Sequence, residues 1–215
     1  MVKCRTDSAT TLGLGHEAGS ARGGPPVAPE TPRIPPLPEA EWTDGQRELL
    51  DAFGSPAPDL PRRDDNVFTT LARHEGLFKV WLRFGGFLLT RGELPARERE
   101  LLILRAGYNC GSDYEWGQHV RLAEMLGLAR EEIDRVAAGP EAEGWSPLEA
   151  ALLRAADELH EGAKISDETW ILLTGSYDEQ ALIEIPMVVG HYTMLAFALN
   201  SFGVPLDEGL QPRPG

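Results

Sequence analysis

Ser112, Glu115 and His119 are separated by three and four residues in the stretch SDYEWGQHVRLAEML. On a helix, this spacing places the three side chains on one face. The same face continues into Leu122 and Leu126, so we expect a carboxylate and an imidazole to point toward the protein interior. Burying such groups is unfavourable unless they are hydrogen-bonded or paired. Because such burial is common at sites of chemistry, this stretch is the first candidate for a catalytic site.

Glu115 and His119 together are typical of a general acid/base pair. A carboxylate can orient an imidazole and bring its pKa close to the working pH. A simpler interpretation is a structural hydrogen bond between residues four apart on one helix. A single inward histidine can also be a hydrogen-bonded core residue. Ser112 is most simply the N-cap of the helix, and that position is compatible with a second role in a site.

The elements that must position these residues are predicted to be helices. Apolar residues at helical spacing follow candidate capping residues (Thr43, Asn66 and Ser146), and glycine or proline ends these stretches. We expect Pro186 to kink or interrupt the last helix. Nothing predicts a strand pair, a repeat or a second domain, so the fold class is all-α, a compact multi-helix array. The expected helices cover residues 43–53, 66–74, 75–90, 95–106, 112–126, 130–138, 146–162, 166–175 and 178–202.

Residues 1–38 differ in composition from the rest of the chain. They are rich in small residues, glycine and proline, and they end in the run PRIPPLP. Such a segment cannot bury enough apolar surface to offset its ordering entropy, so we expect a disordered N-terminal tail. Its last residues are expected to be extended in polyproline conformation. The helical domain is expected to span residues 39–210.

The composition, with 42% hydrophobic and 25% charged residues, is that of a soluble globular protein. The net charge of −14 argues against nucleic-acid and anionic-membrane partners, because both require basic surfaces. The two cysteines, Cys4 and Cys110, do not form a disulfide framework, so reduced cytoplasmic thiols are the simpler interpretation. We expect neither a membrane span nor a secretory signal, since no sufficiently long apolar run predicts one.

Two stretches, RERELLILRAGYNCGSDYEWGQHVRLAEMLGL and HYTMLAFALNSFGVPLDE, resemble the carboxymuconolactone decarboxylase-like family. Its superfamily also contains the alkylhydroperoxidase-D-like (AhpD-like) enzymes. The resemblance extends over residues 40–207. It implies an alkylhydroperoxidase-D-like helical array that assembles as a trimer or hexamer, with sites close to subunit interfaces.

The peroxidase branch of this superfamily carries a Glu, a Cys-x-x-Cys pair and a His. These positions fall on Glu100, on Ser112 and Glu115, and on His119, so both sulfurs are missing. Thiol peroxidation needs a thiolate nucleophile and a resolving partner. Cys110 lies two residues before the first motif position, where a helix N-terminus could lower its thiol pKa, but it has no resolving cysteine nearby in the sequence.

The decarboxylase branch implies proton transfer around a lactone carboxylate substrate, without an organic cofactor or a metal ion. His119 would then donate or accept the proton, while Glu100 and Glu115 orient it or handle a second proton. A solvated charge cluster is the alternative for Glu100. A mixed nitrogen and oxygen metal site is a further alternative for these residues together with His191, although no two histidines have metal-ligand spacing. The remaining pocket residues are expected to shape the site or, in the case of the arginine, to bind an anionic substrate: Ser112, Tyr114, Trp116, Arg105 and His191.

Three functions are therefore in competition. The first is a cofactor-independent decarboxylase or lyase that acts by general acid/base catalysis on a small carboxylated molecule, derived from a lactone or an aromatic compound. The second is a residual thiol peroxidase, with peroxiredoxin activity, that uses Cys110. The third is a non-catalytic oligomeric binding protein. We expect a small-molecule substrate and a cytoplasmic homo-oligomer.

Overall fold

The computed structural model describes residues 31–52 and 65–215, and every regular element within these ranges is helical. This confirms the predicted all-α class. Short 3-10 turns lie at Glu39–Glu41 and Ala72–His74. The α-helices are α1 (Asp44–Ala52), α2 (Asn66–Leu71), α3 (Glu75–Thr90), α4 (Ala96–Asn109), α5 (Asp113–Met125), α6 (Arg130–Ala138), α7 (Pro147–Gly162), α8 (Asp167–Thr174) and α9 (Glu179–Phe202).

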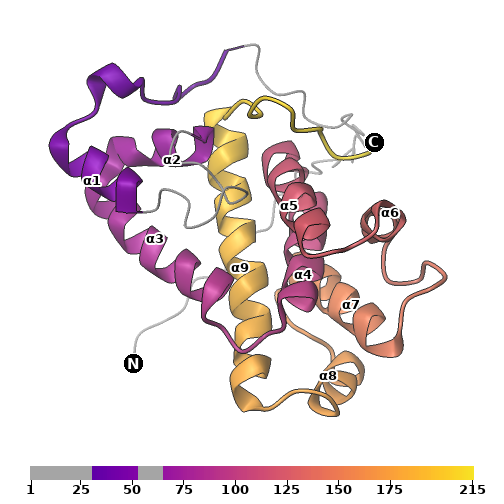
Figure 1. The fold of residues 1–215 in the computed structure, drawn as a ribbon. Helices are drawn as coiled ribbons and strands as arrows, with labels where there is room; N and C mark the ends of the chain where they lie inside the picture. The colour runs from indigo at the N-terminus through magenta and orange to yellow at the C-terminus, as the bar shows by residue number, and fades with distance from the viewer. Residues whose placement is uncertain (1–30, 53–64) are drawn as a thin grey trace, which may run out of the picture.

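Helix α9 runs through the middle of the array, with α3 on one side and α4 and α5 on the other (Figure 1). It packs against α3, α4, α5 and α7, and α4 in turn packs against α5, α6 and α7. The largest buried cluster joins apolar side chains of both helices, including Leu102 and Ile103 from α4 and Ile185 and Val188 from α9. Burial of this kind is the main stabilising contribution to a helical array. The pair α4 and α9 therefore forms the frame on which the other helices are placed.

The central helix differs from the sequence-based expectation in two respects. Pro186 does not interrupt it, because α9 is one helix from Glu179 to Phe202. Packing on four neighbours outweighs the backbone hydrogen bond that a proline removes. By length and composition, α9 could also cross a membrane, which the sequence did not lead us to expect. However, it is a core helix with 56% of its most apolar window buried, so this is weak evidence for a span.

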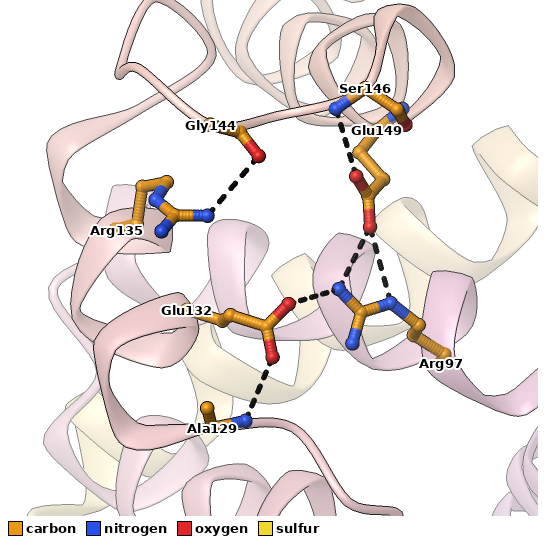
Figure 2. A network of polar contacts seen from close by, with 7 residues as sticks. All are labelled: Arg97, Ala129, Glu132, Arg135, Gly144, Ser146 and Glu149. Atoms are coloured by element: carbon orange, nitrogen blue, oxygen red, sulfur yellow. Dashed lines mark hydrogen bonds and ion pairs between the residues drawn. The ribbon is translucent and has the colours of Figure 1, made fainter.

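An ion-pair network fixes the beginning of α4 (Figure 2). The Arg97 guanidinium donates to Glu132 of α6 and, at 2.8 Å, to Glu149 of α7. Both carboxylates also accept a backbone N–H at the start of their own helix, from Ala129 and Ser146 respectively. Each glutamate therefore caps one helix and binds another, which holds α6 and α7 against α4.

The predicted capping residues mostly cap the expected helices. Thr43 and Gln46 exchange hydrogen bonds at the start of α1, and Ser146 and Glu149 do the same at α7. The prediction that Asn66 caps its helix is wrong. Asn66 is the first residue of α2, and its backbone N–H donates to Asp207 Oδ1 at 2.9 Å. The C-terminal segment therefore supplies the cap that the local sequence lacks.

Of the predicted N-terminal tail, residues 1–30 lie outside the described residues. Residues 31–38 lie on the helical domain. The backbone N–H groups of Arg33 and Ile34 donate to the carbonyl of Phe202 at 2.7 and 3.2 Å. Leu37 is buried in a cluster with Trp42 of the following segment. The proline-rich run therefore has specific contacts with the end of α9 and with the region around α1.

Candidate active site

Two consecutive helices bring a histidine and two glutamates together. Glu100 lies on α4, whereas Glu115 and His119 lie one turn apart on α5. Their exposed fractions are only 1%, 3% and 5%, so none of them is a solvated surface group. The 2.6 Å separation of His119 Nδ1 from Glu100 Oε2 is that of a charge-assisted hydrogen bond. His119 Nε2 lies 3.9 Å from Glu115 Oε2. The solvated charge cluster considered for Glu100 is therefore excluded.

The environment changes the protonation of this cluster. Burial raises the pKa of Glu115 to about 7, although the charge of His119 acts to lower it. Burial alone would lower the pKa of His119, but the Glu100 and Glu115 carboxylates outweigh it, so the His119 pKa is raised. Glu115 can therefore gain or lose a proton near neutral pH, which is the property that general acid/base catalysis needs, while the raised pKa of His119 favours its protonated form.

The cluster lies on the wall of a cavity of about 640 Å³. Helices α3, α4, α5 and α9 all contribute to its lining, so it is formed between the frame helices and α3. Most of its surface is apolar, as is common for small-molecule sites. Of the predicted site residues, the cavity brings together Glu100, Tyr114, Glu115, His119 and His191.

His191 and Tyr192 of α9 form the part of the wall next to the cluster. The Tyr192 ring lies edge-on to His119 on one side and to His191 on the other, with centroid separations of 4.8 and 5.1 Å. His191 stacks on Trp81 of α3 at 5.9 Å. Burial, together with the charge of His119, lowers the pKa of His191 to about 4, so this imidazole is neutral at pH 7. The neutral imidazole can form a hydrogen bond with a ligand, but it cannot supply a positive charge for an anionic ligand.

Sequence reasoning missed the cation of the site, which is Arg99. This side chain lines the cavity with a residue exposure of 9%, and its Nε lies 3.9 Å from Glu100 Oε1. Arg99 Nε is buried and has no hydrogen-bond partner among the described residues. The sequence does carry a signal, since Arg99 precedes the buried Leu102 and Ile103 by three and four residues. That spacing places Arg99 on an inward face of α4.

The predicted anion-binding residue, Arg105, does not line the cavity. Its guanidinium donates to both carboxylate oxygens of Asp157 and to the carbonyls of Val136 and Ala137 at the end of α6. All of these contacts join α4 to α6 and α7. The expectation that Arg105 faces a substrate is therefore wrong, because its position on α4 points it away from α5.

Two other predicted pocket residues also lie elsewhere. Ser112 is fully buried as the N-cap of α5, where its hydroxyl accepts the backbone N–H of Glu115 at 3.4 Å. Trp116 packs in a separate core cluster, against Tyr108 and away from the cavity. Tyr114 does line the cavity, but its hydroxyl already donates to Asp207 and accepts from Val67 and Gln118. Its contribution to the cavity is therefore its ring.

Cys110 is not placed to serve this site. It is the C-cap residue of α4, and it does not line the cavity. Burial raises the pKa of its thiol, although a hydrogen bond with Thr193 acts in the opposite direction. The expectation of a lowered pKa is therefore wrong, since the thiol lies at the carboxyl end of one helix. Within residues 31–52 and 65–215, no group of three or more His, Cys, Asp or Glu side chains is arranged to hold a metal ion.

Comparison with known proteins agrees with this architecture. The model of the carboxymuconolactone decarboxylase family matches residues 75–158, which include Glu100, Glu115 and His119. A comparison with curated proteins gives no significant sequence match.

Three solved structures illustrate the similarity of fold. An uncharacterized peroxidase-related protein from Silicibacter sp. TM1040 has a TM-score of 0.68 at 15% identity, over 88% of this chain and 96% of that one. The debrominase Bmp8 has a TM-score of 0.68 at 14% identity, over 81% and 92%. The AhpD core of an uncharacterized peroxidase-related protein from Ralstonia eutropha JMP134 has a TM-score of 0.63 at 19% identity, over 81% and 93%. Residues 75–158 thus match the carboxymuconolactone decarboxylase family, and the described part of the chain has an AhpD-like fold.

Proposed function

We propose that this protein is a cofactor-independent enzyme that uses general acid/base catalysis on a small carboxylated molecule, in a decarboxylase or lyase-type reaction. The observation that carries the proposal is the buried Glu100–His119–Glu115 cluster on the wall of a ligand-sized cavity. The match of residues 75–158 to the carboxymuconolactone decarboxylase family, and the likeness of the fold to that of a debrominase, support catalysis in general. The particular reaction is our inference from the chemistry of the cluster.

The roles of the three residues follow from their geometry. The Glu100 carboxylate accepts a hydrogen bond from His119 Nδ1, which fixes the imidazole orientation and leaves Nε2 on the side of Glu115. Nε2 and the Glu115 carboxyl can then exchange protons with a bound molecule. When a substrate carboxylate leaves as carbon dioxide, its bonding electron pair stays on the substrate carbon. His119 or Glu115, in its protonated form, supplies the proton that this carbon needs.

Arg99 completes the site as its anion-binding group. Its guanidinium is buried beside Glu100 and lacks a hydrogen-bond partner at Nε among the described residues. A buried cation without a hydrogen-bonded anion is unfavourable, so binding an anionic group there is favourable. A substrate carboxylate, or the negative charge that develops as carbon dioxide leaves, is such a group.

A thiol peroxidase is the alternative function, and the site geometry disfavours it. The two motif positions hold Ser112 and Glu115, and the serine is occupied as a helix cap. Cys110 has a raised pKa and lies outside the cavity lining. One structural neighbour, a variant of the debrominase Bmp8, has been solved in complex with 2,3,4-tribromopyrrole. That complex supports the idea that this fold can hold a small ring compound, which we extend to the present chain as a proposal.

Oligomer formation is a further part of the proposal. Exposed large apolar side chains follow helical spacing on α3 (Leu77, Val80, Phe84 and Phe87) and on α9 (Ile183, Met187, Met194 and Phe197). Contiguous exposed apolar faces of this kind are typical of protein interfaces. We propose that a second copy of the chain covers them. The AhpD-like fold indicates a soluble protein, and we propose a cytoplasmic location.

The proposed function can be tested by measuring carbon dioxide release from a carboxymuconolactone-type substrate and from a panel of other small carboxylates. His119→Ala and Glu115→Gln should each lower the rate by about 100-fold or more, because each removes a proton-transfer group. Glu124→Gln, on the exposed face of α5, is the matched control and should retain wild-type activity. Unchanged turnover in His119→Ala would refute the mechanism. No release of carbon dioxide by folded wild-type protein from any member of the panel would refute the reaction class.

A further inference from the structure

We propose that the substrate of this cavity is an aromatic monocarboxylate with an oxygen substituent on its ring. In this arrangement Arg99 binds the carboxylate, aromatic side chains of the cavity wall contact the ring, and His191 forms a hydrogen bond with the ring oxygen. This inference rests on the proposed function because it assigns the substrate class of the same site. It rests on three features of the cavity wall: one buried arginine, a continuous row of rings, and a buried imidazole whose Nδ1 lacks a hydrogen-bond partner among the described residues.

The buried end of the cavity can take one negative charge. Arg99 is the only buried arginine among the described lining residues, since Arg83 and Arg91 are exposed, and the other buried group that can be positive, His119, is paired with Glu100. Glu100 is already paired with His119, and Glu115 has a pKa of about 7. One substrate carboxylate on Arg99 would therefore balance the charge of the site. A second buried carboxylate would face Glu100 and Glu115 without a cation of its own, which is strongly unfavourable.

A row of rings connects the proton-transfer cluster to the apolar part of the cavity. It runs from His119 to Tyr192, then to His191, and ends at Trp81, with neighbouring centroids 4.8, 5.1 and 5.9 Å apart. Phe68 continues the row, 6.2 Å from Trp81. Aromatic side chains favour offset-stacked or edge-to-face contacts with other rings. The row therefore favours a flat unsaturated ring over a saturated one.

A glycine in α3 allows the His191 imidazole to pack closely against that helix. A Cβ atom at Gly85 would lie 2.9 Å from His191 Nε2, so a side chain at position 85 would displace the imidazole. His191 is buried, with 4% of its surface exposed, and its Nδ1 has no hydrogen-bond partner among the described residues. A buried imidazole without a partner is unfavourable. A hydroxyl on a bound ring would supply a hydrogen bond to this imidazole.

These features separate the proposed substrate from a lactone that carries two carboxylates. Such a lactone would bring a second negative charge to a site with a single buried arginine, and its ring would gain little from the aromatic row. A ring that has a carboxylate at one end and a hydroxyl at the other would use both Arg99 of α4 and His191 of α9, which line the same cavity. The compound 4-hydroxybenzoate has this arrangement and is available as a probe.

Binding of matched probes to the full-length protein tests the assignment by calorimetry. We expect 4-hydroxybenzoate to bind about tenfold more tightly than benzoate, which lacks the ring oxygen, and than cyclohexanecarboxylate, which lacks the aromatic ring. Binding of the uncharged 4-hydroxybenzamide should be weaker by tenfold or more. Equal affinities for all four probes, or no binding of 4-hydroxybenzoate at millimolar concentration, would overturn the proposal.

Variants assign each contact to a residue. Arg99→Gln should weaken 4-hydroxybenzoate binding by at least tenfold and remove the preference over the amide, whereas Arg99→Lys should retain part of that preference. His191→Phe keeps a ring in the row and should remove only the preference over benzoate. Gly85→Ala should weaken 4-hydroxybenzoate more than benzoate. Arg130→Gln, at an exposed position, is the control and should bind like wild type. Unchanged preferences in Arg99→Lys, Arg99→Gln and His191→Phe, with the fold verified by circular dichroism, would overturn the assignment.

The same measurements distinguish this inference from the proposed reaction. His119→Gln should still bind 4-hydroxybenzoate but lose turnover. Binding with the predicted preferences but without carbon dioxide release would leave the substrate class standing and reject the reaction. Turnover of a lactone by protein that binds none of the aromatic acids would leave the reaction standing and reject the substrate class.

Discussion

Glu115→Gln should stabilise the protein at alkaline pH while removing its activity. In the folded protein, burial holds the Glu115 pKa at about 7, against an ordinary value of 4.5. At pH values between 4.5 and about 7, Glu115 has lost its proton in the unfolded chain but retains it in the folded protein. Stability therefore falls as the pH rises through this window, because folding must either retain the proton or bury the charge.

The size of the effect follows from the two pKa values. Between pH 5 and pH 8, the Glu115 carboxyl should reduce the free energy of unfolding by about 2 to 3 kcal/mol. Glutamine has nearly the same shape and no charge, so the variant lacks this contribution. His119 acts in the same direction: its raised folded-state pKa gives stability that is lost as the pH rises through that pKa. Because the Glu115 carboxylate helps to raise the His119 pKa, the variant should have a still flatter pH dependence.

Urea unfolding at pH 5 and pH 8 measures this difference directly. Wild type and Glu115→Gln should differ little at pH 5, whereas at pH 8 the variant should be more stable by about 2 to 3 kcal/mol, or roughly 5–10 °C in Tm. Glu124→Gln, exposed on the same helix, should stay within about 0.5 kcal/mol of wild type at both values. Parallel pH dependences for wild type and Glu115→Gln would refute the conclusion that Glu115 is an unpaired buried acid.

Other predictions concern single residues around the cluster. Glu100→Gln should lower the His119 pKa, measured by NMR titration, because the hydrogen-bonded carboxylate that raises it is lost; an unchanged His119 titration would contradict the pairing. Ser112→Ala should destabilise the protein by about 1 kcal/mol in urea unfolding through loss of the α5 cap, and a change within about 0.2 kcal/mol would contradict that role. Cys110 should react with iodoacetamide at pH 7.5 more slowly than a free thiol, because burial raises its pKa, and its alkylation should leave carbon dioxide release intact; loss of activity on alkylation would instead favour a thiol mechanism.

The spacing of Ser112, Glu115 and His119 was sufficient to predict their shared face, because helical periodicity depends only on neighbours along the chain. The same local information identified the caps at Thr43 and Ser146. It could not identify contacts between distant segments. The cap of α2 comes from Asp207, 141 residues away from the N–H group that it accepts.

The arginines of α4 illustrate the same limit. Arg97, Arg99 and Arg105 are alike in type, and the sequence alone gave no reason to prefer the one that faces the cavity. In the structure, Arg97 and Arg105 each donate to carboxylates on neighbouring helices, whereas Arg99 lies beside Glu100 in the cavity wall. Which arginine stays free for a ligand depends on where Glu149 and Asp157 of α7 are placed. That placement is a property of the packed array.

Two positions at this cavity oppose local preferences. Glycine within a helix costs about 1 kcal/mol relative to alanine, yet Gly85 lies in the middle of α3. Packing explains this glycine, because a Cβ atom there would collide with His191. A carboxyl that is buried without a hydrogen-bonded ion pair is also destabilising, yet Glu115 is buried on α5. Stability alone would favour an apolar residue at position 115. Departures from local preference are expected where a site needs them, and here the departure keeps a titratable carboxyl at the cavity surface. The burial of Glu115 is therefore an argument for chemistry at this cavity that does not depend on the family resemblance.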